Sequence, residues 1–359
     1  MSGGALPGGA RRGRSWPRHP WLARGAALVL LLLSPSVLPA IESEGRLLVA
    51  NQDDGTLMVF DIPSNTLVAT IPVGKEPHEV VAAPNGRKAW VACSGAAGVA
   101  VVDLTRNAVV KTITHEQLVS PHGLAISPDG RRLVVTSAGS RRVFLVDAVR
   151  DVVERAVTTA HAGPHVVALT RDGKQAWVAN RAAGNLSVID LPALKMSRTV
   201  KTGQAPEGLA ASPNGRWVVA ALAEAGQVVV IDTARMVIAT RLPAGQEPVQ
   251  VVFKPQSAVA LVANRQSGDV TILDVAARQV IATVPVERRP SGLAINPRGN
   301  RAYVANAGSA SVSIVSMPGW EVTGRITTGA HPDGIAFAPP PAAPAKGKSA
   351  SAGTPKAKP

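Results

Sequence analysis

The segment PHGLAISPDGRRLVVTSAGSRRVFLVDAVRDVVERAVTT, residues 121–159, decides the fold. Residues 121–126 are mostly apolar and run into a Pro-Asp-Gly turn, which predicts a strand followed by a tight turn. Residues 131–137 and 142–148 are rich in β-branched and alternating apolar side chains, which predicts a second and a third strand. Residues 152–159 predict a fourth. The segment is therefore expected to form four short strands in succession.

The same pattern recurs along the chain and is marked by a proline at nearly constant spacing. These prolines are Pro77, Pro121, Pro164, Pro206, Pro248, Pro290 and Pro332. The successive spacings are 44, 43, 42, 42, 42 and 42 residues. An aspartate follows at a fixed distance in five units, as Asp103, Asp147, Asp190, Asp232 and Asp274. A repeat of about 42 residues that is built from four strands is typical of a propeller blade.

The two ends of the repeat region complement each other. Residues 46–73 supply three strands of a blade that lacks its first, and residues 332–338 supply a first strand that lacks the rest. Joined, they complete a seventh blade and leave no open sheet edge between the first and last blades. We therefore predict an all-β, seven-bladed β-propeller over residues 41–338, closed by pairing of the N- and C-terminal strands in one four-stranded blade.

The repeat motifs resemble those of a known family. The motifs SPDG (127–130), SVID (187–190) and YVAN (303–306), in units near 42 residues, look like the YVTN-repeat β-propeller family, which includes exported YncE-like proteins. The resemblance covers about residues 46–338. It implies the propeller fold and says little about function, because propellers host unrelated activities.

The segments outside the repeat have a different composition. Residues 1–40 contain five arginines, a short apolar run and a small residue at Ala40, which together predict a secretory signal peptide. We expect the Sec route rather than the twin-arginine route, a periplasmic or secreted location, and no transmembrane span in the mature protein. Residues 339–359 are rich in Pro, Ala and Lys and predict a disordered tail.

The charge and the cysteine content exclude several classes of function. The formal net charge is +14, but nine of these charges lie in the two end segments, so the repeat region carries +5. That modest charge and an aromatic content of 3% argue against nucleic-acid binding. A single cysteine, Cys93, excludes an internal disulfide, a Cys-based zinc site and a CxxCH haem attachment. No GxSxG elbow, P-loop or HExxH motif is present.

The residue that follows each repeat proline is expected to stand at the mouth of the central channel. In chain order these residues are His78, His122, His165, Glu207, Val249, Ser291 and Asp333. Packing between blades does not explain such a polar set. The three remaining histidines of the repeat region, His115, His161 and His331, also lie close to a repeat proline. We therefore predict a histidine-rich ligand-binding face at one end of the channel.

Two interpretations of this face remain open. Imidazole suits zinc or copper, and three histidines with one open position form a catalytic type of metal site, so His78, His122 and His165 are candidate ligands. Glu79 and Glu116 could orient such histidines through hydrogen bonds. The alternative is a polar funnel in which the histidines cap loop backbone groups and hold no metal.

Other recurring residues are interpreted as structural. The aspartates of the repeat are expected to hold turns through side-chain hydrogen bonds. Trp90, Trp177 and Tyr303 share one position in the second strand and are expected to pack between blades. Cys93 takes the place of a repeat asparagine and is expected to be a small strand-end residue rather than a reactive thiol.

These observations favour an exported, monomeric binding or interaction protein over an enzyme. Its partner would be a protein or a small molecule at the histidine-rich face. The alternative is a metal-dependent enzyme or cofactor-binding protein, for example a lactonase-like hydrolase, with a metal at the channel mouth. No catalytic residue can be assigned from the sequence.

Overall fold

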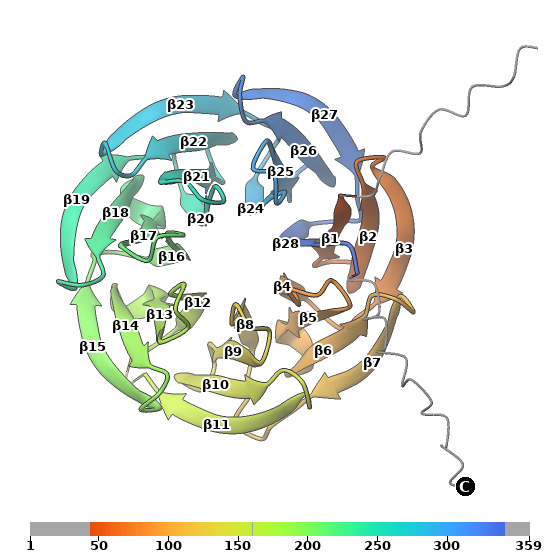
Figure 1. The fold of residues 1–359 in the computed structure, drawn as a ribbon, viewed down its shortest axis with the longest axis horizontal. Coiled ribbons are helices and arrows are strands. Elements are labelled where there is room, and N and C mark those ends of the chain that lie inside the picture. The colour runs from red at the N-terminus through yellow and green to blue at the C-terminus, as the bar shows by residue number, and fades with distance from the viewer. Residues whose placement is uncertain (1–43, 160, 342–359) are drawn as a thin grey trace, which may run out of the picture. The chain divides into compact units, whose positions relative to one another are not determined.

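Seven four-stranded sheets surround a common axis in the computed structural model, which describes residues 44–159 and 161–341 (Figure 1). The fold is the all-β, seven-bladed propeller that the repeat predicts. The leader over residues 1–40 and residues 342–359 of the expected tail lie outside the described residues. No helix of the described part is long and apolar enough to cross a membrane.

Each blade consists of an inner, a second, a third and an outer strand, and each inner strand begins at a repeat proline. The inner strands, for blades 1 to 7, are β4 (Pro77–Ala82), β8 (Pro121–Ile126), β12 (Pro164–Leu169), β16 (Pro206–Ala211), β20 (Pro248–Phe253), β24 (Pro290–Ile295) and β28 (Pro332–Ala338). The second strands are β5 (Lys88–Cys93), β9 (Arg132–Ser137), β13 (Gln175–Asn180), β17 (Trp217–Leu222), β21 (Val259–Asn264), β25 (Arg301–Asn306) and β1 (Gly45–Asn51).

The third and outer strands complete the blades in the same order. The third strands are β6 (Gly98–Asp103), β10 (Arg142–Asp147), β14 (Asn185–Asp190), β18 (Gln227–Asp232), β22 (Asp269–Asp274), β26 (Ser311–Ser316) and β2 (Thr56–Ile62). The outer strands are β7 (Ala108–Ile113), β11 (Val152–Thr158), β15 (Lys195–Lys201), β19 (Val237–Pro243), β23 (Gln279–Pro285), β27 (Glu321–Thr327) and β3 (Thr66–Pro72). Single 3-10 turns follow three of the second strands, as η1 (Ser94–Ala96), η2 (Arg181–Ala183) and η3 (Ala223–Ala225).

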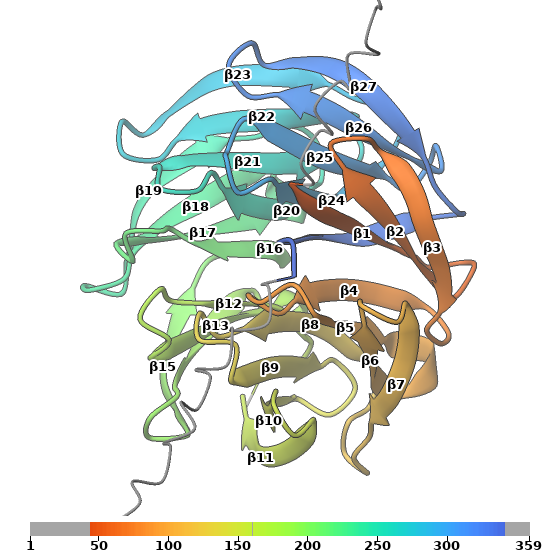
Figure 2. The same cartoon turned by 45° about the vertical axis from the view of Figure 1, so that its right-hand side comes forward.

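Blade 7 joins the two ends of the described chain. Its strand order is β28-β1-β2-β3, and β28 runs antiparallel to β1 with Arg46 opposite Ala338 and Leu48 opposite Ala336. Figures 1 and 2 show the two strands side by side, although they lie almost 300 residues apart in the chain. The predicted closure is confirmed, and it removes an open edge at which another strand could pair.

Apolar side chains fill the spaces between neighbouring blades. Trp90 of β5 is 1% exposed and packs with Leu133 of β9 and Phe144 of β10. Trp177 and Tyr303 are fully buried at the equivalent positions. These aromatic residues are therefore inter-blade packing, as expected from the repeat, and each removes a large apolar area from water.

The recurring aspartates hold the turns between third and outer strands. Asp147 Oδ1 accepts hydrogen bonds from the backbone N–H groups of Val149 (2.8 Å) and Arg150 (2.9 Å). Asp190, Asp232 and Asp274 make equivalent bonds to turn residues. Their structural interpretation is confirmed. Cys93 is buried and burial raises the pKa of its thiol to about 11, so it is the inert strand-end residue expected.

Candidate functional site at the channel mouth

The backbone just before each repeat proline positions the residues of the channel mouth. The preceding residues have positive φ, namely Glu76 (49°), Ser120 (48°), Gly163 (71°), Ala205 (46°), Glu247 (55°), Arg289 (55°) and His331 (53°). Each of their carbonyls accepts a hydrogen bond from the first residue after the second strand, for example Ser94 N to Glu76 O at 3.0 Å and Arg265 N to Glu247 O at 2.8 Å. Because this conformation is strained for a non-glycine residue, the hydrogen bond is needed to hold it. The residue after each proline is thereby held in an equivalent place in every blade.

The three histidines after the prolines of blades 1 to 3 form a continuous stack. The ring centroids of His78 and His122 are 3.7 Å apart, and those of His122 and His165 are 3.6 Å apart. The outer two rings are 6.1 Å apart and nearly perpendicular. The structure therefore brings together the three histidines that the repeat placed in one column, although they are 43 or 44 residues apart in sequence.

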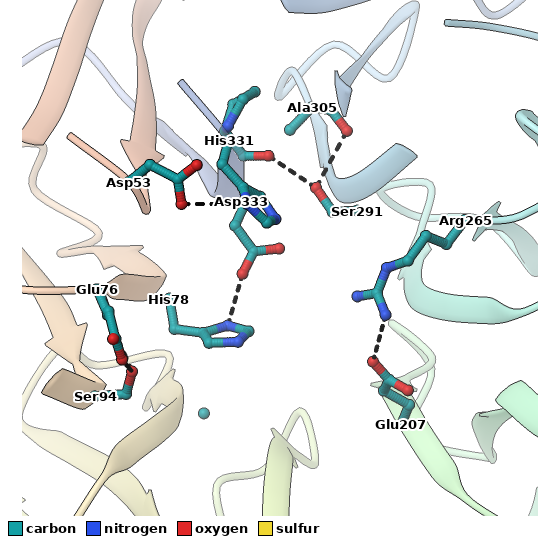
Figure 3. Close-up of polar contacts among 12 residues, drawn as sticks. Asp53, Glu76, His78, Ser94, Glu207, Arg265, Ser291, Ala305, His331 and Asp333 are labelled. Atoms are coloured by element: carbon teal, nitrogen blue, oxygen red, sulfur yellow. Dashed lines mark hydrogen bonds and ion pairs between the residues drawn. The ribbon is translucent and has the colours of Figure 1, made fainter. Parts of the chain in front are cut away.

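Asp333 of blade 7 lies at the end of this stack and contacts His78. His78 Nδ1 and Asp333 Oδ2 are 2.7 Å apart, and the two side chains point toward each other (Figure 3). Burial opposes the charge on both groups, yet their attraction and hydrogen bond raise the pKa of His78 and lower the pKa of Asp333. The pair fixes the orientation of the His78 ring, and the other ring nitrogen, Nε2, remains available to a ligand.

His122 and His165 each have an unsatisfied ring nitrogen. His122 is 8% exposed, and the Nδ1 atoms of both rings are buried without a hydrogen-bond partner. Burial, followed by the charge of neighbouring histidines, holds the pKa of His122 well below its usual range and that of His165 at about 3. Both rings are therefore neutral near pH 7, and their nitrogens are available to a ligand.

Glu79 follows His78 in β4 and interacts electrostatically with both His78 and Asp333. Burial and the nearby charge of Asp333 raise its pKa to about 8. Its carboxyl group accepts a hydrogen bond from the Gln250 side chain, which comes from blade 5 on the far side of the axis. Gly334 makes the close approach here possible, since a Cβ at that position would lie 2.5 Å from the His78 carbonyl oxygen and 2.8 Å from Glu79 Cα. We call His78, Glu79, His122, His165 and Asp333 the acid–imidazole cluster.

A second charged group faces this cluster across the channel mouth. Glu207 of β16 is 5% exposed, and its two oxygens contact Arg181 Nε at 3.2 Å and Arg265 Nη1 at 3.3 Å. Arg265 Nη1 also contacts Glu247 at 3.1 Å. Figure 3 shows Arg265 and Glu207 paired with each other and apart from His78 and Asp333. We call Arg181, Glu207, Glu247 and Arg265 the guanidinium cluster.

The remaining column residues, Val249 and Ser291, are buried. Ser291 Oγ donates a hydrogen bond to the carbonyl oxygen of Pro332 at 2.9 Å and thereby ties blade 6 to blade 7 beside Asp333 (Figure 3). These two residues act in packing and in joining blades.

Three other predicted site residues lie outside the acid–imidazole cluster. His115 accepts a hydrogen bond from Gln117 N at 3.1 Å, and its ring packs against Phe144 of β10. His161 Nε2 is 3.0 Å from Thr199 Oγ1 on the outer strand β15. His331 Nδ1 contacts Asp53 at 3.4 Å in a loop beside Asp333. Glu116, expected as a possible histidine partner, is exposed.

A metal site of three converging ligands is not formed by this arrangement. Among residues 44–159 and 161–341, no three His, Cys, Asp or Glu side chains are grouped so that they could hold a metal ion. The rings of His78, His122 and His165 pack against one another instead, with neighbouring rings tilted by 43° and 36°. The sequence did not single out Gln250 or Glu247. Gln250 could have been found by alignment of the repeats, because four of the seven inner strands have glycine at its position.

Comparison with protein families gives one match. A family model described as the cytochrome D1 heme domain matches residues 132–285, which run from the start of β9 to the end of β23. The chain is thus similar to that propeller family over blades 2 to 5. The matched segment includes His161 and His165 but neither His78 nor His122. No curated protein matches the chain.

Solved structures share the architecture at low sequence identity. Hydrazine synthase of Kuenenia stuttgartiensis matches with a TM-score of 0.66 and 22% identity, covering 73% of this chain and 90% of that one. A protein of unknown function from Desulfotomaculum acetoxidans matches with a TM-score of 0.72 and 11% identity, covering 82% of this chain and 99% of that one. At these identities the likeness shows the propeller fold.

Proposed function

We propose that the protein is a binding protein that takes a ligand at the acid–imidazole cluster. The observation that carries the proposal is the pair of buried, unpartnered Nδ1 atoms on His122 and His165. A buried polar atom without a partner costs roughly 1–3 kcal/mol. Five asparagine Oδ1 atoms and the Tyr303 hydroxyl are also buried without a partner, but the two imidazole atoms differ from them because they belong to neighbouring rings of one polar cluster at the channel mouth.

The surroundings of these atoms support binding rather than catalysis. Asp333 fixes the ring of His78, and neutral imidazoles offer nitrogens that need no deprotonation at pH 7. The described part of the cluster contains no serine, cysteine or lysine that could act as an activated nucleophile.

A haem group is the cofactor named in the description of the matched family. A planar macrocycle would need a slot between rings or an imidazole nitrogen that faces open space. His122 lies 3.7 Å and 3.6 Å from its two neighbours by ring centroid, which is van der Waals separation and leaves no room for a macrocycle between them. The residues therefore do not fit a haem within the stack, and no step of the proposal uses one.

A metal ion is the second candidate, and the His78–Asp333 pair favours it. A carboxylate that accepts a hydrogen bond from one imidazole nitrogen commonly orients the other nitrogen toward a metal. Zinc or copper would then bind His78 Nε2, and one or both of His122 and His165 would have to rotate out of the stack. Elemental analysis after incubation with zinc, copper, nickel and iron salts tests this candidate. Less than about 0.2 metal per chain, in the wild type and in the His78/His122/His165→Ala variant, would exclude it.

The binding proposal is tested with protein labelled with ¹⁵N in its histidine rings. Zn²⁺, haemin, n-butylamine and butyrate are added separately, and the ring nitrogen signals are followed by NMR. We expect at least one probe to move the signals of His122 and His165 and to leave those of His115 and His161 in place. The same probe should have no effect on His165 in the His122→Phe variant, which keeps a ring in the stack without its nitrogens.

If none of the four probes moves the signals of His122 and His165, the cluster is a structural feature and the proposal is wrong. The His161→Ala variant is the matched control, since His161 belongs to the same type of loop but contacts β15 instead of the cluster. Its response to every probe should equal that of the wild type.

We also propose that the protein is exported, on the basis of the arginine-rich and apolar residues 1–40. Fractionation of cells that express the full chain, followed by N-terminal sequencing of the mature form, tests this. A mature N-terminus near residue 41, in the periplasmic fraction or in the medium, is the expected result. A full-length protein retained in the cytoplasm would contradict it.

A further inference from the structure

We propose that the ligand of the acid–imidazole cluster is a cation that carries a primary ammonium group. This inference rests on the proposed binding function and specifies the chemistry of the ligand. Either a free small amine or the side chain of a lysine in a partner protein would supply the group.

The charge of the inner strands points to a cation. The first three residues of the seven inner strands read PHE, PHG, PHV, PEG, PVQ, PSG and PDG. They contribute three carboxyl groups, from Glu79, Glu207 and Asp333, and no lysine or arginine. This is the reverse of the repeat region as a whole, in which basic residues outnumber acidic ones and the net charge is +5. The two guanidinium groups at the mouth, Arg181 and Arg265, lie against Glu207 and Glu247 and form no ion pair with Glu79 or Asp333.

The three carboxyl groups differ in how they are neutralised. Glu207 is paired with two guanidinium groups, Arg181 and Arg265. Asp333 has only an imidazole, His78, within ion-pair distance among the described residues. Glu79 accepts hydrogen bonds from the Gln250 amide and from Val80 N, and no described lysine or arginine forms an ion pair with it. Near pH 7 Glu79 keeps its proton, because its pKa is raised to about 8, so the ionised carboxylate on the acid–imidazole side is that of Asp333. A cation bound beside both groups would favour loss of the Glu79 proton and so place a second carboxylate next to it.

The unsatisfied atoms of the cluster suit a hydrogen-bond donor. An ammonium group donates three hydrogen bonds and accepts none. His122 is more than nine-tenths buried, and the stack places its orphan Nδ1 beside His78, which in turn contacts Asp333. In the tautomer that carries its proton on Nε2, His122 Nδ1 is an acceptor, and so are the Asp333 carboxylate and the Glu79 carboxylate once its proton is lost. One ammonium group would donate hydrogen bonds to these acceptors.

An ammonium group agrees with the observed geometry better than a metal ion does. A metal needs three ligand atoms that converge, and the described residues provide no such group. An ammonium group on a narrow alkyl chain needs less rearrangement, because hydrogen bonds tolerate a wider range of distances and angles than metal–ligand bonds do. The hydrogen bond between Glu79 and Gln250 joins the inner strands of blades 1 and 5, so the Glu79 carboxyl group is already held in place for a donor.

The experiment uses n-butylamine and Nα-acetyl-lysine methylamide as probes of the mature protein. Their matched controls are butyrate and the Nε-acetylated form of the same lysine derivative, which have similar chains without the positive charge. Binding is measured by the shifts of the ¹⁵N-labelled histidine rings. We expect both amines to move the signals of His122 and His165, and neither control to do so. Tighter binding of the lysine derivative would identify a protein partner as the source, and equal binding would identify a small amine.

Variants of the two carboxyl groups complete the test. Glu79→Gln and Asp333→Asn should each weaken amine binding at least tenfold, whereas Glu224→Gln, an exposed acid on the same side of the ring, should leave it unchanged. Unchanged binding in both cluster variants would overturn the inference. If butyrate or Zn²⁺ moves the histidine signals and the amines do not, the binding function stands and the cationic ligand is wrong. If no probe moves them, both are wrong.

Discussion

The two sides of the channel mouth are built on the same backbone and differ in how their charges are satisfied. In the guanidinium cluster, Glu207 has a cation at each carboxylate oxygen, and Arg265 has a second carboxylate in Glu247. In the acid–imidazole cluster, two ring nitrogens have no partner and Glu79 has no cation. Equivalent positions of the repeat therefore differ in whether their polar groups have partners. The satisfied side is expected to contribute to stability, and the unsatisfied side holds the atoms that the proposed ligand would contact.

This contrast follows from the cost of burying polar groups. An ion pair with additional hydrogen bonds compensates for the loss of water, and an unpartnered atom does not. Substitutions on the guanidinium side should therefore reduce stability, and substitutions on the other side should reduce binding while stability stays equal or rises. The four predictions below test this contrast.

The largest effect on stability is expected for Arg265→Gln. The change leaves Glu207 with one guanidinium partner and Glu247 with none, in a place where Glu207 is 5% exposed. We expect a loss of about 2–3 kcal/mol in the free energy of unfolding, measured with urea at pH 7. The control Arg171→Gln removes an exposed arginine and should change it by less than about 0.5 kcal/mol. An equal loss of stability in Arg265→Gln and Arg171→Gln would contradict the stabilising role of the ion pairs that Arg265 makes.

Glu79→Gln should stabilise the protein in a manner that depends on pH. The unfolded glutamate titrates near 4.5, whereas the folded one keeps its proton up to about 8. Between these values the folded state binds more protons, so the stability of the wild type falls as the pH rises. Glutamine does not titrate and avoids this fall. The variant should match the wild type near pH 4.5 and exceed it by about 2–4 kcal/mol at pH 8, as measured by urea unfolding across that range. A constant difference at all pH values would contradict the buried, protonated carboxyl group.

His122→Phe should abolish the effect of the ligand on His165 without reducing the stability of the protein. Phenylalanine keeps a ring between His78 and His165 and removes the orphan nitrogen, so unfolding should cost the same or about 1 kcal/mol more than in the wild type. Ligand-induced shifts of the His165 ring should disappear. His122→Leu serves as a second variant in case the larger ring does not fit. A loss of more than about 2 kcal/mol in both variants would mean that the His122 nitrogens are satisfied after all.

The smallest effects are expected for His115→Ala and His161→Ala. Each ring makes one polar contact in a loop away from the cluster, to Gln117 N or to Thr199 Oγ1. Loss of that contact should cost about 0.5–1 kcal/mol and leave the binding of amines unchanged. Weaker amine binding in either variant would show that the binding site extends beyond the acid–imidazole cluster and includes His115 or His161.

The site could be predicted only in part. The column after the repeat prolines correctly placed His78, His122, His165 and Asp333 together, because every blade repeats the same backbone. The predicted histidine-rich face also included His115 and His161 because they lie near a repeat proline, but nearness to a proline in sequence does not say whether a loop side chain turns toward the axis or toward an outer strand. The contact of His161 with Thr199 depends on the outer strand of the blade, which no local pattern reports.

The sequence by itself determined the architecture of the ring. The proline spacing and the turn motifs are local signals that recur along the chain, and the complementary partial blades at residues 46–73 and 332–338 show how the ring closes. Only the tertiary structure decided which polar side chains contact each other at the channel mouth. Three contacts of the site join different blades. They are the packing of His122 between two other imidazoles, the pair of His78 with Asp333, and the hydrogen bond between Glu79 and Gln250. Ring closure sets the distances between blades, so the ionisation and the free atoms of the site follow from the closed propeller.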